Sequence, residues 1–302
     1  MFCKFLFFFA KLYFVFTNFS YVADVKLDDG GNEVIAHAPM LDLGGLIKPG
    51  TVVRMKESKP GGKTSHSIQL VGVNEVECGN VPGTMTWIGA NPNLGNSVAK
   101  QLIEQGHITA ALLGGDDSKN NTNTITKIQS EVKMKSHEGE DTVRSDFVIN
   151  EKVVVEVKSC VCADYHKDTV PEFSKKDRYV IVVSKEDNPK KYQRTGIFPI
   201  GKPAQKFEDQ KVVSERCIKH LRHLSKIASG KDKNDYKESA LLMIVNRGDC
   251  QKFRPCKESC PIFAEEFVAA IAAGVRVMAA KIIWNENGDC YFGGLLPIVK
   301  ND

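Results

Sequence analysis

The residues best suited to chemistry lie in one short segment, RSDFVINEKVVVEVK, at residues 144–158. If residues 150–152 form a three-residue hairpin turn, antiparallel pairing of the flanking strands places Asp146 directly opposite Glu156. Directly opposed residues have Cβ atoms about 4.5–5.5 Å apart. Lys158 shares the face of Glu156 because side chains alternate along a strand. The segment therefore predicts that two carboxylates and an ammonium group lie together.

Two carboxylates that face each other across a strand pair repel, and a divalent cation between them would relieve that repulsion. Mg²⁺ and Mn²⁺ prefer oxygen ligands, activate bound water and stabilise negative charge on a phosphoryl group. A lysine beside them can orient the water or bind the developing charge. The pattern predicts a phosphodiester-hydrolysing site in which Asp146 and Glu156 hold Mg²⁺ or Mn²⁺ and Lys158 assists catalysis.

An ordinary surface Glu–Lys pair is the alternative interpretation, because E-x-K is a short motif with many false positives. The valines around Glu156 favour the site, since a charge within a buried strand usually has a specific partner. Glu131, on a β-prone run at residues 130–134, offers a further carboxylate. It is either an additional catalytic and metal-binding residue or a surface charge, and its spacing does not decide between the two.

A basic helix is predicted over residues 213–228, where apolar side chains recur at helical spacing. Arg216, Lys219, His220 and Arg222 occupy much of the rest of its surface. Such a face can bind nucleic-acid phosphates, although a solvated basic face is the commoner outcome for a single charge run. We therefore expect DNA as a partner, with RNA as a further candidate.

The elements that must position these residues change in character along the chain. Between residues 22 and 85, short β-prone runs separated by Gly, Pro, Asp and Asn predict a small barrel or sandwich. The second half alternates β-prone and helical segments, which is typical of an α/β domain. Helices are predicted at residues 92–106, 213–228 and 262–274, and strands at 145–149, 153–159, 240–245 and, as the last strand, 275–284.

Residues 164–211 form a segment too long for an ordinary loop, and they are predicted to be an insertion with some structure of its own. The segment contains a β-prone run at residues 178–184. Residues 164–237 carry 18 Lys plus Arg and 11 Asp plus Glu, a local charge of +7 in a chain whose net charge is +4. The basic character of the chain is therefore local.

Composition and cysteine usage restrict the class of protein. The chain has 302 residues, of which 42% are hydrophobic and 26% charged, so a mostly disordered, collagen-like or coiled-coil chain is excluded and two domains are expected. Its nine cysteines are an odd number, which favours free thiols in a reducing compartment. Cys250, Cys256 and Cys260 lack the paired spacing of a zinc site.

The apolar amino terminus is interrupted by Lys4 and Lys11, and no uncharged stretch reaches the ~20 residues of a membrane-spanning helix. We therefore expect no membrane partner. A signal peptide cleaved after Ala23 and a buried first strand are the two interpretations that its composition leaves open.

An ordered set of motifs in this chain resembles the sugar fermentation stimulation protein A family. Single motifs are weak, but their order is specific and they extend over nearly the whole chain. They are FSYVADV (19–25), AHAP (36–39), GGLIKPG (44–50), WIGAN with Asn96 (87–96), SEVK (130–133), SDF (145–147), EVKS (156–159), and SER and KHL within 214–221.

The resemblance implies an α/β (α+β) protein with an OB-like β-barrel at residues 1–85. A PD-(D/E)-x-K nuclease-like domain with a mixed central sheet would follow at residues 86–302. On this resemblance Asp146, Glu156 and Lys158 match the nuclease-like signature, and Glu131 matches the acidic residue of SEVK. The family's H-x-P-N-T-G motif loses its Asn, Thr and Gly at residues 37–42, where a barrel contact with nucleic acid would otherwise be expected.

Two functions follow from these observations. The first is a DNA-binding protein with a nuclease-like site and a role in regulating sugar metabolism, and the alternative is an active Mg²⁺-dependent endo- or exonuclease. A third hypothesis, a sugar or nucleotide enzyme, is not supported, because the sequence shows no Gly-rich phosphate loop and no nucleophile triad. Because cleavage after Ala23 would remove part of the strand that resembles the family's first, a cytoplasmic location is expected, with an organellar setting left open.

Overall fold

The structure of the protein is a computed structural model. It describes residues 3–4, 8–14, 21–27, 31–39, 43, 45–47, 49–74, 85–115, 124–135, 142–170, 180–232 and 236–299. The polar stretch at 116–123 and the amino-terminal residues 15–20 lie outside these ranges. Within them, no helix is both long and apolar enough to span a membrane.

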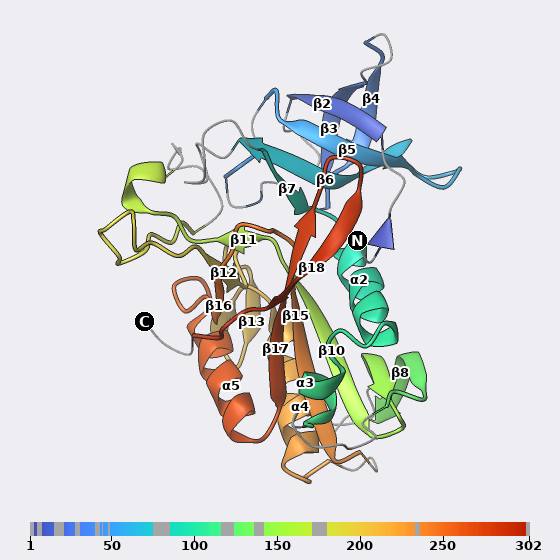
Figure 1. The fold of residues 1–302 in the computed structure, drawn as a ribbon, viewed down its shortest axis with the longest axis vertical. Coiled ribbons are helices and arrows are strands. Elements are labelled where there is room, and N and C mark those ends of the chain that lie inside the picture. The colour runs from blue at the N-terminus through green and yellow to red at the C-terminus, as the bar shows by residue number, and fades with distance from the viewer. Residues whose placement is uncertain are drawn as a thin grey trace.

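The amino-terminal strands close into a ring (Figure 1). The sheet runs in the order β4-β3-β2-β5-β6, and β4 pairs back to β6 in parallel. Alternate side chains such as Val25, Val53 and Met55 fill the interior. This arrangement confirms the expected barrel-like first part. Its strands are β2 (Phe8–Phe14), β3 (Val22–Leu27), β4 (Glu33–His37), β5 (Val52–Glu57) and β6 (His66–Asn74).

One strand joins this ring to the rest of the molecule. β7 (Met85–Gly89) pairs with β6 and meets β17 (Arg276–Trp284) where Trp87 faces Trp284. The ring and the second sheet therefore share one hydrogen-bonded network. The predicted boundary between residues 85 and 86 falls at the start of this strand, and it stays a prediction.

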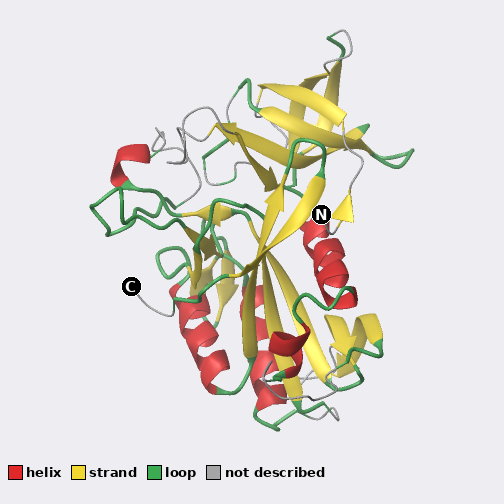
Figure 2. Cartoon of the chain, in the orientation of Figure 1, coloured by secondary structure: helices red, strands yellow, loops and turns green. Residues whose placement is uncertain are grey.

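The second part is a mixed sheet covered by helices on both faces (Figures 1 and 2). β10, β15 and β17 are parallel, whereas β8, β9 and β18 are antiparallel to their neighbours. α2 and α3 pack on one face, and α4 and α5 on the other. The further elements are β8 (Ile128–Lys135), β9 (Thr142–Ile149), β10 (Val153–Cys160), β15 (Glu238–Val245), β18 (Asp289–Leu295), α2 (Pro92–Glu104), α3 (Thr109–Leu113), α4 (Glu215–Ala228) and α5 (Pro261–Ala272).

The sequence pattern predicted that the strand ending at Trp284 is the last one, and this prediction is wrong. β18 follows that strand after a tight turn in which the Asn285 side chain accepts the Asn287 and Asp289 N–H groups. Asn287 and Gly288 are a typical hairpin pair, so this signal was present in the sequence. β18 also pairs with the short β1 (Cys3–Lys4).

The predicted insertion does carry structure of its own. The β-prone run at 178–184 forms no strand in its described part, where Val183 makes a single bridge to Tyr165. β12 forms a small sheet with β11 and β16, and β13 pairs with β14. These elements, with a 3₁₀ turn at Lys167–Thr169, are β11 (Cys162–Ala163), β12 (Thr195–Phe198), β13 (Gln205–Phe207), β14 (Gln210–Val212) and β16 (Lys252–Pro255).

A buried ionic cluster fixes the insertion to the end of β15. Asp249 accepts hydrogen bonds from Arg194 at 2.5 Å and from Arg247 at 2.7 Å. Burial by itself raises the pKa of Asp249, but Arg247 and Arg194 together hold that pKa well below its ordinary value. The structure shows free thiols, as the sequence predicted, at Cys160, Cys162, Cys217, Cys250, Cys256, Cys260 and Cys290.

Candidate functional site

The predicted hairpin forms with the predicted register. Asn150 and Glu151 adopt left-handed backbone angles, with φ of 51° and 56°, and the Lys152 N–H donates to the Ile149 carbonyl at 2.9 Å. The Asn150 side chain also accepts the Thr126 N–H at 2.8 Å, which anchors the turn. The strands pair Ile149 with Val153, and this register continues to Phe147 and Val155. The turn therefore brings Asp146 to the level of Glu156.

Beyond the Phe147–Val155 pair, the Asp146 side chain rather than a backbone carbonyl accepts the hydrogen bond from β10. Its Oδ2 accepts the Val157 N–H at 2.7 Å, while Asn96 of α2 donates to its Oδ1 at 2.9 Å. Burial, followed by the nearby negative charge of Glu156, raises the pKa of Asp146 above its ordinary value. The two carboxylates are thus close enough to repel, as the sequence predicted.

Glu156 lies on β10 with 4% of its surface exposed. Its Oε1 contacts both the Lys158 ammonium group and the His220 imidazole of α4. Burial alone raises the pKa of Glu156, but the hydrogen bond from His220 and the charge of Lys158 outweigh it and lower that pKa. The glutamate is therefore held as an anion despite its burial.

His220 is oriented by a second residue of its own helix. The Arg216 Nε donates to the His220 Nε2 at 3.3 Å. A guanidinium group has only donors, so Nε2 must be an acceptor and Nδ1 carries the proton that faces Glu156. Lys158 Nζ lies 3.5 Å from this Nδ1. His220, which we expected to bind phosphate, instead contacts Glu156 of the acidic pair formed by Asp146 and Glu156.

The other predicted basic residues of α4 are arranged differently. Lys219 is exposed and forms an ion pair with Glu215 at 2.7 Å. Arg222 bonds to Glu266 at 2.7 Å and to Glu208 at 3.1 Å, and its guanidinium lies 4.6 Å from the Phe207 ring centre. Arg222 is therefore engaged by two carboxylates, whereas Arg216 remains exposed beside the site.

Glu131 does not join the acidic pair. The register of β8 and β9 places it opposite Asp146, because Ser130 faces Phe147 and Val132 faces Ser145. However, Glu131 has a φ of 57°, and its carboxylate pairs with Arg144 at 2.5 Å with 48% of the side chain exposed. Of the two interpretations left open by the sequence, the arrangement favours a surface charge.

Sequence reasoning did not assign two contacts that support the site. The first is the hydrogen bond from Asn96, whose only signal was its place in the family-like stretch at residues 87–96. The second is the Ser159 hydroxyl next to Lys158, which accepts a hydrogen bond from buried Asn246 at 2.7 Å. Gly95 allows α2 to approach β10 here, since a Cβ added at Gly95 would lie 3.3 Å from the Ser159 Cβ.

The donors of the site suit a hard cation. No three His, Cys, Asp or Glu side chains converge as metal ligands within the described ranges, so a cation here would take its ligands from two carboxylates and from water. Mg²⁺ is commonly held by one or two carboxylates together with water. Asp146 and Glu156 supply such a pair. Burial raises the pKa of Asp146 most, and the negative charge of Glu156 raises it further; a divalent cation would relieve this second effect.

The fold and site together define a sheet-rich α+β protein in which a barrel-like amino-terminal sheet continues into a mixed sheet with a buried acidic–basic cluster. A family model described as "Sugar fermentation stimulation protein RE domain" matches residues 209–288. A curated sugar fermentation stimulation protein homolog from Cyanothece sp. is 26% identical over 278 residues, covering 90% of this chain and 88% of the relative. The homolog from Acaryochloris marina is 24% identical over 278 residues, covering 90% and 86%.

The fold comparison agrees with these relatives. A solved structure, "The structure of Pyrococcus Furiosus SfsA in complex with Ca2+", matches with a TM-score of 0.62 and 17% identity, covering 98% of each chain. The family model, the curated relatives and the solved structure are thus all similar to this chain under one family name, the sugar fermentation stimulation protein (SfsA) family. The resemblance found in the sequence motifs is thereby confirmed.

Proposed function

We propose that this protein binds DNA and hydrolyses its phosphodiester bonds at a divalent-metal site formed by Asp146 and Glu156 beside Lys158. The observation that carries the proposal is the meeting of these three charged groups, two of them carboxylates whose charges already influence each other. A pair of carboxylates next to a lysine on adjacent strands suits phosphoryl chemistry, in which negative charge develops on phosphate oxygens.

Mg²⁺ or Mn²⁺ would be held by the Asp146 and Glu156 carboxylates. When bound, such an ion stabilises negative charge on phosphoryl oxygens and acidifies a water molecule. The Pyrococcus furiosus SfsA structure is a complex with Ca²⁺, which supports this choice because Ca²⁺ and Mg²⁺ both prefer oxygen ligands. Asn96 and the Val157 N–H orient the Asp146 carboxylate, and His220 orients that of Glu156.

Lys158 and Arg216 are the chain's own cations at this site. The Lys158 ammonium group balances Glu156 and lies where it can contact a phosphate oxygen or orient the attacking water. Arg216 is exposed one turn of α4 before His220, and with Lys219 it offers donors to the flanking backbone phosphates. Arg222 is not part of this proposal because two carboxylates hold its guanidinium.

A cleavage assay tests the proposal directly. End-labelled single- and double-stranded DNA and RNA are incubated with the protein in Mg²⁺, Mn²⁺ or EDTA. The wild type should give products only with metal, and Glu156→Gln should lower the rate by at least about 100-fold, since it removes a carboxylate ligand without changing its shape. Glu151→Gln is the matched control, because Glu151 is an exposed carboxylate at the turn of the same hairpin.

A second candidate is a DNA-binding protein that does not cleave, with a role in regulating sugar metabolism. It is favoured by one observation, the turn of Glu131 toward Arg144 and away from the acidic pair. Metal-independent, salt-sensitive DNA binding with intact substrate under every metal condition would support this candidate and overturn cleavage.

A further inference from the structure

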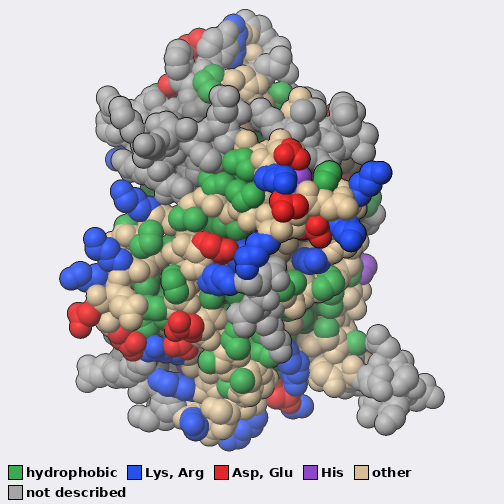
Figure 3. Space-filling view, turned by 90° about the vertical axis from the view of Figure 1, so that its left-hand side faces the viewer, with side chains coloured by type: hydrophobic (Ala, Val, Ile, Leu, Met, Phe, Trp, Pro, Cys, Tyr) green, Lys and Arg blue, Asp and Glu red, His purple; other side chains and the backbone are tan. Residues whose placement is uncertain are grey.

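A polar pocket lies outside the acidic site and outside the function proposed for it. Its volume is about 520 Å³, within the usual range of small-molecule sites. It opens between the 183–195 segment and β16, on the side of the molecule seen in Figure 3, where Lys, Arg, Asp and Glu side chains gather across the middle of the face. Neither the acidic pair nor α4 contributes to it.

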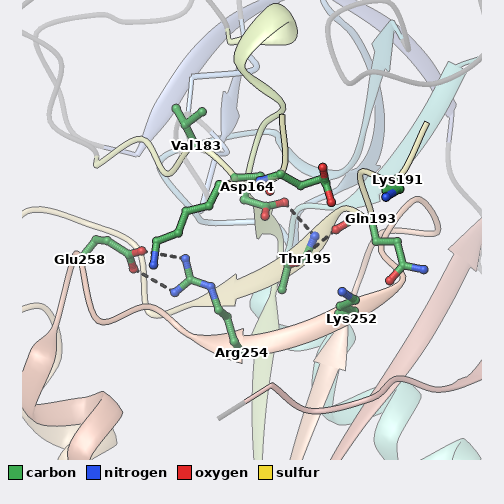
Figure 4. Close-up of a pocket in the computed structure, with 11 residues that line it drawn as sticks. Asp164, Val183, Lys191, Gln193, Thr195, Lys252, Arg254 and Glu258 are labelled. Atoms are coloured by element: carbon green, nitrogen blue, oxygen red, sulfur yellow. Dashed lines mark hydrogen bonds and ion pairs between the residues drawn. The ribbon is translucent and has the colours of Figure 1, made fainter. Parts of the chain in front are cut away.

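One wall of the pocket is held in place by hydrogen bonds that its own residues form with their neighbours. Arg254 is 7% exposed, and its guanidinium group donates two hydrogen bonds to the Glu258 carboxylate, at 2.7 and 2.9 Å. Asp164 is 5% exposed, and its Oδ1 accepts the Thr195 N–H at 2.8 Å and the Tyr192 hydroxyl at 3.0 Å. These groups form the preorganised polar wall that Figure 4 shows.

The other end of the pocket carries unbalanced positive charge. Lys191 and Lys252 lie at this end with Gln193 (Figure 4), and the parallel pairing of β12 with β16 sets Lys252 beside Thr195. Within the described ranges, neither lysine forms an ion pair. Glu186, the remaining acid of the lining, instead accepts the Asn188 N–H at 2.9 Å. Two ammonium groups at one end of a concave site favour an anion there.

The composition of the lining restricts the rest of the ligand. Val183 is the only apolar residue among those that line the pocket in the described structure, and no aromatic ring faces it to stack a nucleobase. Asp164, Gln193 and Thr195 instead offer acceptors and donors suited to hydroxyl groups. The volume also exceeds what a single inorganic phosphate would fill.

From this arrangement we propose that the pocket binds a small phosphorylated polyhydroxy compound. Its phosphate contacts Lys191 and Lys252, and its hydroxylated body lies against Gln193 and the Asp164 wall. The site is separate from the acidic pair, so it stands whether or not the protein cleaves DNA.

Titration calorimetry with ribose 5-phosphate, ribose and inorganic phosphate as probes tests this proposal. Ribose 5-phosphate should bind more tightly than either fragment. The Lys191→Gln, Lys252→Gln double variant should weaken it at least tenfold, because each lost charged hydrogen bond costs about that factor. Lys56→Gln with Lys63→Gln removes the same charge from exposed positions that do not line the pocket, and should leave binding unchanged.

The Gln193→Ala variant tests the contact with the hydroxylated body of the ligand separately from the contacts with its phosphate. It should weaken ribose 5-phosphate and leave inorganic phosphate unaffected. Thermal unfolding of each variant shows that it is folded. The proposal is overturned if the folded wild type binds no probe, if the lysine pair has no effect, or if phosphate alone binds as tightly as ribose 5-phosphate. It is equally overturned if these lysines bind single-stranded DNA instead of the small probe.

Discussion

Replacing each acidic residue of the site by its amide should change the stability of the metal-free protein in opposite directions. Glu156→Gln leaves the Lys158 ammonium group, only 15% exposed, without the carboxylate that it contacts. Removing one partner of a fully buried ion pair costs about 3–5 kcal/mol. Partial exposure and the remaining charge of Asp146 reduce this to about 2 kcal/mol, equivalent to a fall in Tm of about 3 °C for a chain of this length.

Asp146→Asn should be neutral or stabilise the protein by up to about 1 kcal/mol. Because burial and Glu156 raise the pKa of Asp146, its ionised form is disfavoured in the folded state, and this cost appears as the pH rises through its ordinary value. The asparagine oxygen can still accept the Val157 N–H, and the Asn96 amide can turn to present its oxygen to the new amide group.

Urea unfolding in EDTA at neutral pH measures both variants against wild type, with Glu151→Gln as the exposed control. The advantage of Asp146→Asn should shrink as the pH falls and wild-type Asp146 becomes protonated. Equal destabilisation by both variants, or greater destabilisation by Asp146→Asn, would refute the inference that these carboxylates repel while Lys158 and His220 stabilise Glu156.

Three further predictions follow from the described contacts. Asn96→Ala should lower the free energy of unfolding by about 1 kcal/mol, because the Asp146 carboxylate loses a hydrogen bond. It should also weaken Mn²⁺ binding about 10–100-fold in calorimetry, because that carboxylate is no longer oriented. An unchanged Mn²⁺ affinity would count against a positioning role of Asn96. Asp249→Asn should cost about 3 kcal/mol at neutral pH, and this difference should vanish as the pH falls through the depressed folded pKa, which acid unfolding measures. Arg216→Ala with Lys219→Ala should reduce the log–log salt slope of DNA binding by about 2, whereas Arg222→Ala should leave the slope intact; an unchanged slope in the double variant would exclude this face of α4.

The hairpin could be predicted because its determinants are local. Side chains alternate along a strand, so Glu156 and Lys158 share a face, and a turn of three residues then fixes the register. α2 was predictable for the same reason, since Pro92 stands at its first turn and the Asn91 side chain caps the Asn93 N–H. The hairpin that carries Asp146, Glu156 and Lys158 was therefore predictable before any tertiary contact was known, while their role in a site stays a prediction.

The partners of these residues depend on contacts between distant segments. His220 is 64 residues from Glu156, and Asn96 is 50 residues from Asp146, so no periodicity in the sequence links them. Glu131 illustrates a different difficulty. Its spacing places it opposite Asp146, but a left-handed backbone angle at a non-glycine residue turns its carboxylate to Arg144.

The proposed site requires that Asp146 and Glu156 together hold a divalent cation. Mn²⁺ soaked into crystals of the wild-type protein, with anomalous diffraction collected near the manganese edge, tests it most directly. We predict one strong anomalous peak in contact with both carboxylates, which is lost in Asp146→Asn. A peak bound elsewhere, or no peak at a Mn²⁺ concentration that saturates binding in solution, would contradict the claim.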